Sequence, residues 1–122
     1  MSRRIYQEQE HCPVARTLNI LGERWTLLII RDMLAFKKTR FSELLNSLPG
    51  LSPNLLSQRL KELEECGIIE RQLYSEHPPR MEYRLTPKGK ALGPVLQSMR
   101  NWGEQYEPLE AESQAASTSS ST

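Results

Sequence analysis

Residues 48–69 have the sequence LPGLSPNLLSQRLKELEECGII, and this stretch decides the fold. The Pro-Gly pair near its start interrupts any helix that precedes it. Ser52 is followed by a proline, a pair typical of helix starts, because serine caps free backbone N–H groups and proline lacks the N–H that would need a partner. The pattern predicts a helix from Ser52 to Cys66, ended by Gly67. Its expected buried stripe consists of Leu56, Leu60 and Leu63.

The residues just before this stretch predict a shorter helix. Phe41, Leu44, Leu45 and Leu48 recur with helical spacing, and Ser42 is the expected N-cap. Two helices joined by a short turn that contains glycine form a helix-turn-helix.

The residues after the stretch predict a β-hairpin. Ile68–Tyr74 is β-prone, and Met81–Leu85 alternates apolar with polar side chains. Between them, Ser75–Arg80 contains two prolines, which do not fit a sheet interior, so we expect a long polar loop at the tip. A hairpin directly after a helix-turn-helix is the arrangement of a wing.

The flanking segments predict three further helical regions. Pro13–Gly22 forms a short helix, and Trp25–Phe36 is apolar on nearly all sides, as expected of a central helix. A last helical region runs from Thr86 to Tyr106, and Pro94 should kink or restart it. One face of that region carries Leu92, Val95, Leu96, Met99, Trp102 and Tyr106. The expected fold class is α+β, mostly helical: a winged helix-turn-helix with further helices before and after it.

Length and composition predict one soluble domain. A chain of 122 residues supports one modest core, which we place at residues 11–109. We expect residues 1–10 to form a flexible arm and residues 110–122, which lack large apolar side chains, to be disordered. No apolar run reaches the roughly 18 residues that span a bilayer, and no secretory signal is expected. Two cysteines fit a reducing cytosol, so the expected location is cytoplasmic, without membrane partners.

Charge is distributed unevenly along the chain. Residues 1–61 carry ten Lys/Arg and five Asp/Glu, whereas residues 62–122 carry six and ten, for a net charge of +1. Binding of nucleic acid needs a local positive face rather than a positive total. The alternative is an accidental asymmetry on a solvated surface.

The predicted long helix carries a polar face opposite its leucine stripe. At about 100° per residue, Asn54, Ser57, Gln58 and Lys61 point outward together near its N-terminal half. In helix-turn-helix proteins this half enters the major groove, where Asn and Gln pair with adenine and Ser and Lys reach base edges or phosphates. A merely solvated face is the alternative. The position of the helix between a short turn and a hairpin favours double-stranded DNA as the partner.

Further candidates for DNA contacts surround that face. The N-terminus of the long helix offers backbone N–H groups to a phosphate. Cations before the shorter helix and at the hairpin tip can hold the DNA backbone, which positions a protein without specifying sequence. Each of these cations has the alternative of being a solvated charge only. The additional candidates are Arg40, Ser52, Pro53, Arg59, His77 and Arg80.

Cys12 is the candidate for a redox switch. It lies at a predicted helix N-terminus, with Arg16 one turn further and His11 beside it, which is a setting that favours a reactive thiolate. The alternative is an inert cysteine that packs against a partner subunit. Cys66 lies near the end of the leucine-striped helix and is interpreted as structural.

No catalytic constellation is found in the sequence. Its two histidines, His11 and His77, offer neither a triad nor a metal set, and its glycines form no phosphate loop. We therefore expect a protein that is not an enzyme and that needs no cofactor and no metal.

The chain carries an ordered series of motifs: Cys12–Val14, Gly22–Ile29, Arg40–Leu44, Leu48–Ser52, Leu56–Leu63, Gly67–Arg71, Pro78–Tyr83, Leu85–Gly89 and Trp102–Gly103. Together they resemble the HxlR family of bacterial and archaeal winged-helix regulators, which are MarR-like. The resemblance covers about residues 11–106. It implies a homodimer in which the first and last helices pack across a two-fold axis on a pseudo-palindromic operator, and some members sense oxidants or electrophiles at the position of Cys12. Two small departures, Arg24 for a usual lysine and residues 35–39 without the usual glycines, affect local loop shape.

The sequence thus favours a sequence-specific regulator of transcription, a repressor that binds its operator as a homodimer. Release would follow modification of Cys12, or binding of a small apolar effector between the Trp25–Phe36 helix and the dimerisation helices. The alternative is a winged-helix protein-interaction module without DNA binding. Basic residues in the motif, among them Lys37 and Lys38, favour the DNA binder, since an interaction module would not require them.

Overall fold

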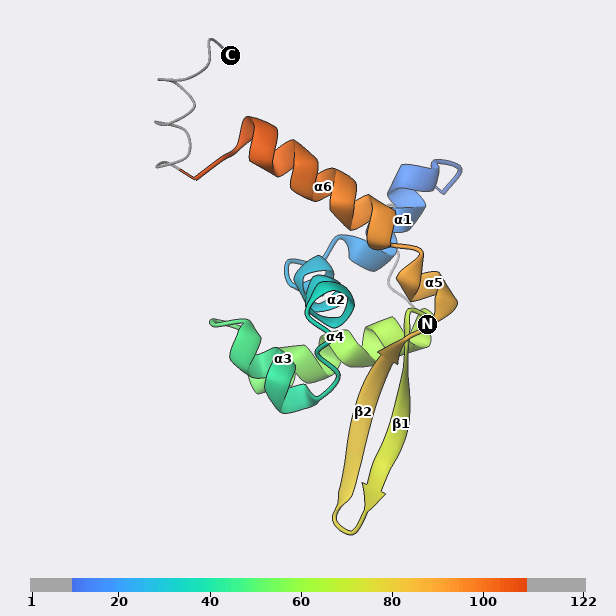
Figure 1. Ribbon diagram of the computed structural model, residues 1–122. Helices are drawn as coiled ribbons and strands as arrows, with labels where there is room; N and C mark the ends of the chain where they lie inside the picture. Colours follow the sequence, from blue (N-terminus) through green and yellow to red (C-terminus); the bar gives the residue numbers. More distant parts are fainter. Residues whose placement is uncertain (1–9, 110–122) are drawn as a thin grey trace. The chain divides into compact units, whose positions relative to one another are not determined.

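The computed structural model describes residues 10–109, of which residues 10–92 belong to one compact unit and residues 93–109 to a second. The first unit holds the helices α1 to α5 and a two-stranded sheet, and the second holds α6 (Figure 1). The flexible arm expected over residues 1–10 and the disordered tail expected over 110–122 lie, apart from Glu10, outside the described residues.

Helix α1 (Pro13–Leu21) begins and ends as the sequence predicted. Cys12 is its N-cap, Pro13 its first residue and Gly22 its C-cap. Ala15 and Leu21 are buried in the first unit, so α1 contributes a narrow apolar edge to the core.

Helix α2 (Thr26–Ala35) is central, but it is not covered on all sides. Ile29 and Ile30 are fully buried, whereas Leu28 keeps a partly exposed side chain. Asp32, which interrupts the apolar pattern, is also fully buried. Its Oδ1 accepts hydrogen bonds from Arg31 Nε (3.0 Å) and from a terminal guanidinium nitrogen of Arg31 (2.8 Å), which offsets the cost of burying a carboxylate.

Helices α3 (Phe41–Ser47) and α4 (Pro53–Glu65) form the helix-turn-helix. The expected N-cap of α3, Ser42, is wrong, because the helix begins at Phe41 and Arg40 holds the cap position. Glu43, the third residue of the helix, accepts a hydrogen bond from the backbone N–H of Arg40, which is the glutamate's part in a capping box.

The start of α4 confirms the predicted serine cap. The Ser52 hydroxyl oxygen accepts a hydrogen bond from the backbone N–H of Leu55 (3.1 Å). The predicted leucine stripe is at most 2% exposed and provides the centre of the core together with Ile29, Ile30, Leu44 and Ile69. Cys66 is the C-cap, as the predicted end of the helix requires.

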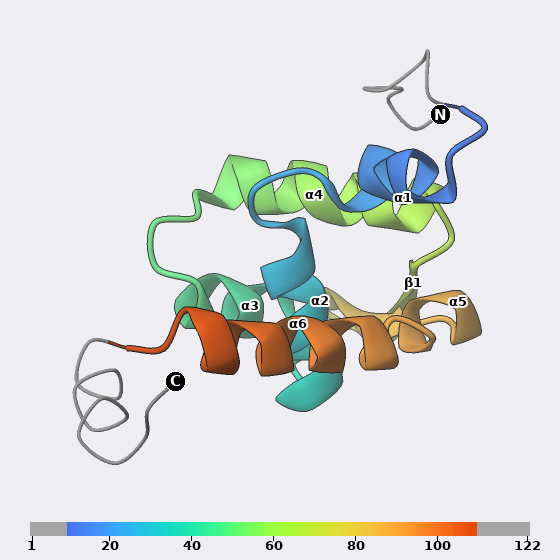
Figure 2. The same ribbon diagram turned by 90° about the horizontal axis from the view of Figure 1, so that it is seen from above.

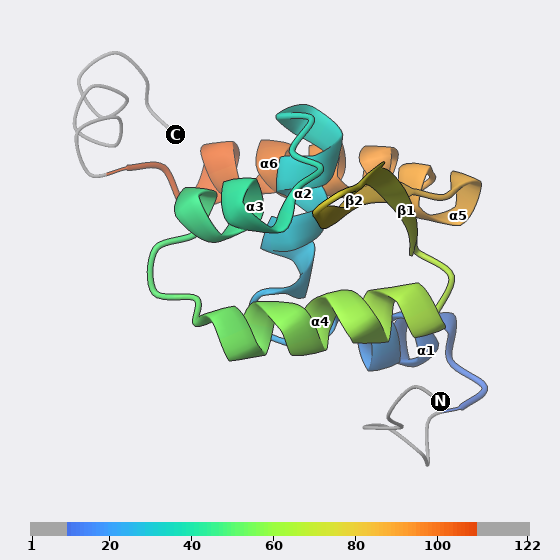
Figure 3. The ribbon, with the colours of Figure 1, turned by 90° about the horizontal axis from the view of Figure 1, so that it is seen from below.

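The turn between α3 and α4 depends on Gly50. Its backbone has φ +96°, a conformation that L side chains rarely adopt, so glycine fits here without strain. Figures 2 and 3 show that this turn lies at one end of α4 and the sheet at the other, so α4 spans the unit between them.

The wing consists of β1 (Ile69–Glu76) and β2 (Pro79–Leu85), paired antiparallel from Ile69↔Leu85 to Glu76↔Pro79. The sequence prediction of a long tip loop over 75–80 is wrong, since only His77 and Pro78 lie between the strands. Proline is accepted at the first residue of a strand that has a single neighbour, because its missing N–H is not needed by a second ladder. The wing projects away from α2, α3 and α4 of the same unit (Figure 1).

Helix α5 (Pro87–Lys90) closes the foot of the wing. The hydroxyl of Thr86 donates to the Ile68 carbonyl (3.1 Å) and accepts from the N–H of Gly89 (3.1 Å). Gly89 lies so close to the Ile68 carbonyl that a Cβ would overlap it. The short helix therefore packs directly on backbone.

Helix α6 (Gly93–Tyr106) begins anew after α5 with Pro94 as its second residue, which confirms the predicted restart. None of its residues is buried. No described helix is both long and apolar enough to cross a membrane.

Candidate nucleic-acid interface

Helix α4 presents a polar surface opposite its buried leucines. Asn54, Ser57, Gln58 and Lys61 are all exposed. The same holds for Ser52 and Pro53 at the start of the helix. The first three turns of α4 therefore carry amide, hydroxyl and ammonium groups free of the core, which are the groups that hydrogen-bond base edges and phosphates.

One member of the predicted DNA-contacting set, Arg59, has to be corrected. It is 8% exposed and turned inward, in contrast to its neighbours. One of its terminal nitrogens lies 2.8 Å from Glu62 Oε1, and the other lies 3.2 Å from Glu23 Oε2. A guanidinium held between two carboxylates under the helix is not available to DNA. The sequence missed this because Glu23 is distant in the chain.

A shallow hollow separates α4 from the wing. Arg71 crosses from β1 toward α4, where its Nε lies 3.1 Å from Glu64 Oε1. Neither Arg71 nor Tyr83 was among the sequence candidates, and their cross-strand pairing is the signal that could have brought them together. The hollow has a volume of about 320 Å³ and is lined by Ser57, Leu60, Lys61, Glu64, Glu65, Arg71 and Tyr83.

Tyr83 supplies a neutral hydroxyl to this hollow. Burial of the ring raises the pKa of the Tyr83 phenol above its ordinary value of 10.0, although the nearby Arg71 guanidinium opposes the shift. The phenol therefore remains protonated at neutral pH and can donate a hydrogen bond to an anion.

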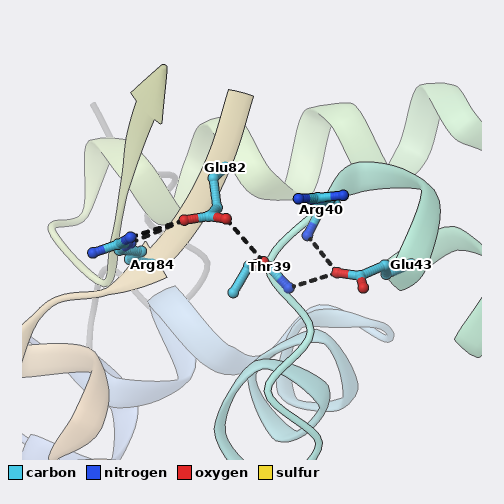
Figure 4. A network of polar contacts seen from close by, with 5 residues as sticks. All are labelled: Thr39, Arg40, Glu43, Glu82 and Arg84. Atoms are coloured by element: carbon cyan, nitrogen blue, oxygen red, sulfur yellow. Dashed lines mark hydrogen bonds and ion pairs between the residues drawn. The ribbon is translucent and has the colours of Figure 1, made fainter. Parts of the chain in front are cut away.

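The wing is tied to the segment before α3 (Figure 4). The backbone N–H of Tyr83 donates to the Thr39 carbonyl (2.7 Å). The Thr39 hydroxyl donates to Oε2 of the Glu82 carboxylate (3.5 Å). The other oxygen of that carboxylate, Oε1, accepts from Arg84 Nε (3.1 Å). The wing and α3 are thereby held together by backbone and side-chain contacts.

Glu43 organises the other half of the network in Figure 4. Its Oε1 accepts from the backbone N–H groups of Thr39 (3.1 Å) and Arg40 (3.0 Å). These two hydrogen bonds lower the pKa of the Glu43 carboxyl below 4.5, with smaller contributions from the positive charges of Lys38 and Arg40. The ionised carboxylate therefore fixes the segment that presents Arg40.

The three side chains outside α4 that are predicted to hold the DNA backbone, Arg40, His77 and Arg80, are accessible. Arg40 is exposed, and its guanidinium carbon lies 4.4 Å from the centre of the Tyr74 ring on β1. This contact orients the guanidinium without neutralising it. His77 and Arg80 are exposed at the end of the wing, where Arg80 pairs with Ser75 across the strands.

Cys12 is a free, half-buried thiol at the N-cap of α1. The Arg16 guanidinium, expected beside it, donates instead to the Glu10 carbonyl (2.7 Å). Cys66 is likewise free and half-buried, but on α4. Among residues 10–109, no three His, Cys, Asp or Glu side chains are grouped to hold a metal ion.

Comparison with known proteins gives matches along most of the chain. A family model described as HxlR-like helix-turn-helix matches residues 20–111. The HTH-type transcriptional regulator YybR of Bacillus subtilis is 38% identical over 102 residues, which cover 84% of this chain and 81% of YybR.

Two proteins of known structure have a similar fold. Reduced YodB, a transcriptional regulator from B. subtilis, matches with a TM-score of 0.67 and 41% identity over 80% of this chain and 96% of its own. YodB has also been solved after diamide treatment. The redox regulator HypR in its reduced form matches with a TM-score of 0.71 and 35% identity, over 81% of this chain and 98% of its own.

Proposed function

Since the chain belongs to the HxlR-like helix-turn-helix family, we propose that it is a transcriptional regulator that binds double-stranded DNA through α4 and the wing. The observation that carries the proposal is the exposed polar face of α4. Its N-terminal half enters the major groove, where Asn54 and Gln58 pair with base edges. Arg40, His77 and Arg80 hold the phosphates on either side, and the protein acts in the cytoplasm as a repressor.

The exposed apolar face of α6 supports a homodimer. Val95, Met99, Trp102 and Tyr106 follow one another at intervals of four, three and four residues, and each is at least 43% exposed. Such a stripe on a helix with no buried residue is typical of a protein interface. A dimer would place two copies of α4 about one helical turn apart, on a pseudo-palindromic operator.

The reading face can be tested by substitution at Asn54 and Gln58. The wild-type protein is first used to select a preferred duplex from a random-sequence pool. Loss of a bidentate contact costs about 1–3 kcal/mol, so we expect Asn54→Ala and Gln58→Ala each to weaken binding to that duplex about tenfold or more. The matched control is Asn46→Ala, which removes an exposed amide from α3.

Two results would count against this assignment. If both α4 variants keep wild-type affinity and select the same duplex, α4 does not read the bases. If affinity for any duplex is weak and insensitive to salt, the chain is an interaction module rather than a DNA binder, because phosphate contacts make affinity fall steeply with salt.

Cys12 is the proposed site of regulation. Two Cys12 thiols from two copies can join in a disulfide, losing two electrons and two protons to an oxidant such as diamide, whose N=N bond takes them up and becomes the N–N bond of a hydrazine. The half-buried free thiol at the start of α1 supports this, as does the reduced and diamide-treated pair of YodB structures. A small apolar effector is the other proposed route to release.

A gel shift with diamide separates these routes. We expect diamide to release the wild-type protein and the Cys66→Ser variant from the selected duplex, and to leave Cys12→Ser bound. Release of Cys12→Ser by diamide to the wild-type extent would rule out the Cys12 switch.

A further inference from the structure

Arg59 is the one cation of α4 that the structure turns away from the exposed face. Its two terminal nitrogens contact carboxylates from different places in the chain. Glu62 lies one turn further along α4, at 2.8 Å, whereas Glu23 lies in the segment between α1 and α2, at 3.2 Å. The Arg59–Glu23 contact is therefore a bond between the helix proposed to read DNA and a different part of the scaffold.

A second contact joins the same segment to the helix-turn-helix. Trp25 lies two residues after Glu23, and its ring packs on the turn at Gly50: a Cβ on that glycine would lie 3.6 Å from Cη2 of the indole. The segment between α1 and α2 thus touches the turn that leads into α4 and the middle of α4 itself. Two separated contacts define the orientation of a helix, whereas one does not.

The chemistry of these contacts is directional. The leucine stripe of α4 gives most of the burial, but apolar contact does not depend on direction and tolerates small rotations or shifts. A guanidinium bonded to two carboxylates has a fixed fork geometry. Because Arg59 is nearly buried, a rotation of α4 that broke the bond to Glu23 would cost the guanidinium one of its two carboxylate partners and leave only Glu62, which turns with the helix.

We propose that Arg59 is a positioning residue, which with Glu23 fixes the orientation of α4 so that its exposed face meets the DNA bases. The inference rests on the proposed function of α4, and it replaces the role of Arg59 as a DNA contact. Sequence-specific binding depends on this ion pair, whereas binding to phosphates alone does not.

The sign of the effect at Glu23 distinguishes positioning from simple electrostatics. Glu23→Gln removes a negative charge, which by charge alone raises affinity for any duplex. Loss of positioning has the opposite effect on a preferred duplex, because base contacts are then misaligned.

The experiment compares Glu23→Gln, Arg59→Lys and the control Glu70→Gln, which removes an exposed carboxylate from β1. Affinity is measured on the duplex selected by the wild-type protein and on a scrambled duplex of the same composition. We expect Glu23→Gln and Arg59→Lys to bind the selected duplex about tenfold more weakly, equal to ~1.4 kcal/mol. On the scrambled duplex, all three variants should bind at least as tightly as the wild type. Glu70→Gln should keep wild-type affinity or gain on both duplexes.

Each outcome decides a separate question. If Glu23→Gln behaves as Glu70→Gln on the selected duplex, the proposal is overturned. It is also overturned if Arg59→Lys flattens the salt dependence on scrambled DNA relative to the wild type, since that indicates a phosphate contact. If circular dichroism shows that Arg59→Lys does not fold, the affinity of the milder Glu23→Gln variant for the selected duplex decides the proposal. If the wild-type protein enriches no sequence from the random pool, the proposed function of α4 is wrong. That selection uses no variant, so its failure is distinct from failure of the Arg59 proposal.

Discussion

At the scale of single residues, Glu43 links folding of α3 to pH. Its pKa is lower than 4.5 because the ionised carboxylate accepts two backbone N–H groups. The stability that it contributes is present above about pH 4.5 and is lost as the pH falls through the lower pKa of the folded state. We therefore expect Glu43→Gln to melt below the wild type at pH 7, and the gap to close toward pH 3. Thermal unfolding followed by circular dichroism measures it.

Ser42→Ala is the matched control for the start of α3. Replacement of a true N-cap serine by alanine lowers the free energy of unfolding by about 1 kcal/mol. Ser42 lies inside the helix, one residue after Phe41, so we expect its loss to leave the melting temperature nearly unchanged at every pH. A large drop would mean that the serine, and not Glu43, caps the helix.

The same scale shows which parts of the site the sequence could predict. Asn54 and Gln58 are exposed because helical periodicity sets them opposite the leucines, and periodicity is a local property. The inward turn of Arg59 depends on Glu23, 36 residues away, and no local pattern records that pairing. Arg59 looks like a surface cation in sequence because its partner arrives only with the tertiary fold.

At the scale of elements, the foot of the wing depends on the close approach of α5 to β1. A methyl group on Gly89 would overlap the Ile68 carbonyl and lie 2.9 Å from Leu85 Cδ2. Because the obstructing atom is backbone, it cannot move aside as a side chain would. We expect Gly89→Ala to destabilise the fold by about 1–3 kcal/mol, measured by urea unfolding. Wild-type stability would show that α5 is free to shift from the wing.

The elements themselves were mostly predictable, and the exceptions have physical reasons. Helix α4 follows from its cap and its leucine stripe, which are both encoded locally. The wing tip was predicted too long because two adjacent prolines suggest a loop, yet in a two-stranded ribbon Pro79 meets no second ladder. The start of α3 was misplaced by the presence of a serine, when a glutamate at the third helical position provides the cap.

At the scale of the whole molecule, the apolar stripe of α6 has no cover among the described residues of its own unit. Trp102 is 60% exposed, and its ring contacts that of Tyr106 at a tilt of 45°, with 5.4 Å between ring centres. Burial of such a ring against a second copy is strongly favourable, whereas burial of a charged side chain at the same position is unfavourable. We expect Trp102→Glu to convert the proposed dimer to a monomer in sedimentation analysis and to weaken binding to the selected duplex at least tenfold. A monomeric wild type would contradict the dimer.

Gly103 gives the sharper test, because its effect has opposite signs with and without a partner. It lies four residues after Met99 and three before Tyr106, within the exposed stripe, and a Cβ there would meet no atom of the described residues within 4 Å. In an isolated helix, Gly103→Ala therefore stabilises by about 0.5–1 kcal/mol. If a second copy packs closely on α6, the same methyl forces the helices apart, and overpacking costs about 1–3 kcal/mol. We expect weaker dimerisation by sedimentation and a lower melting temperature at low protein concentration. An intact dimer with a raised melting temperature would place the partner's contact elsewhere on the surface.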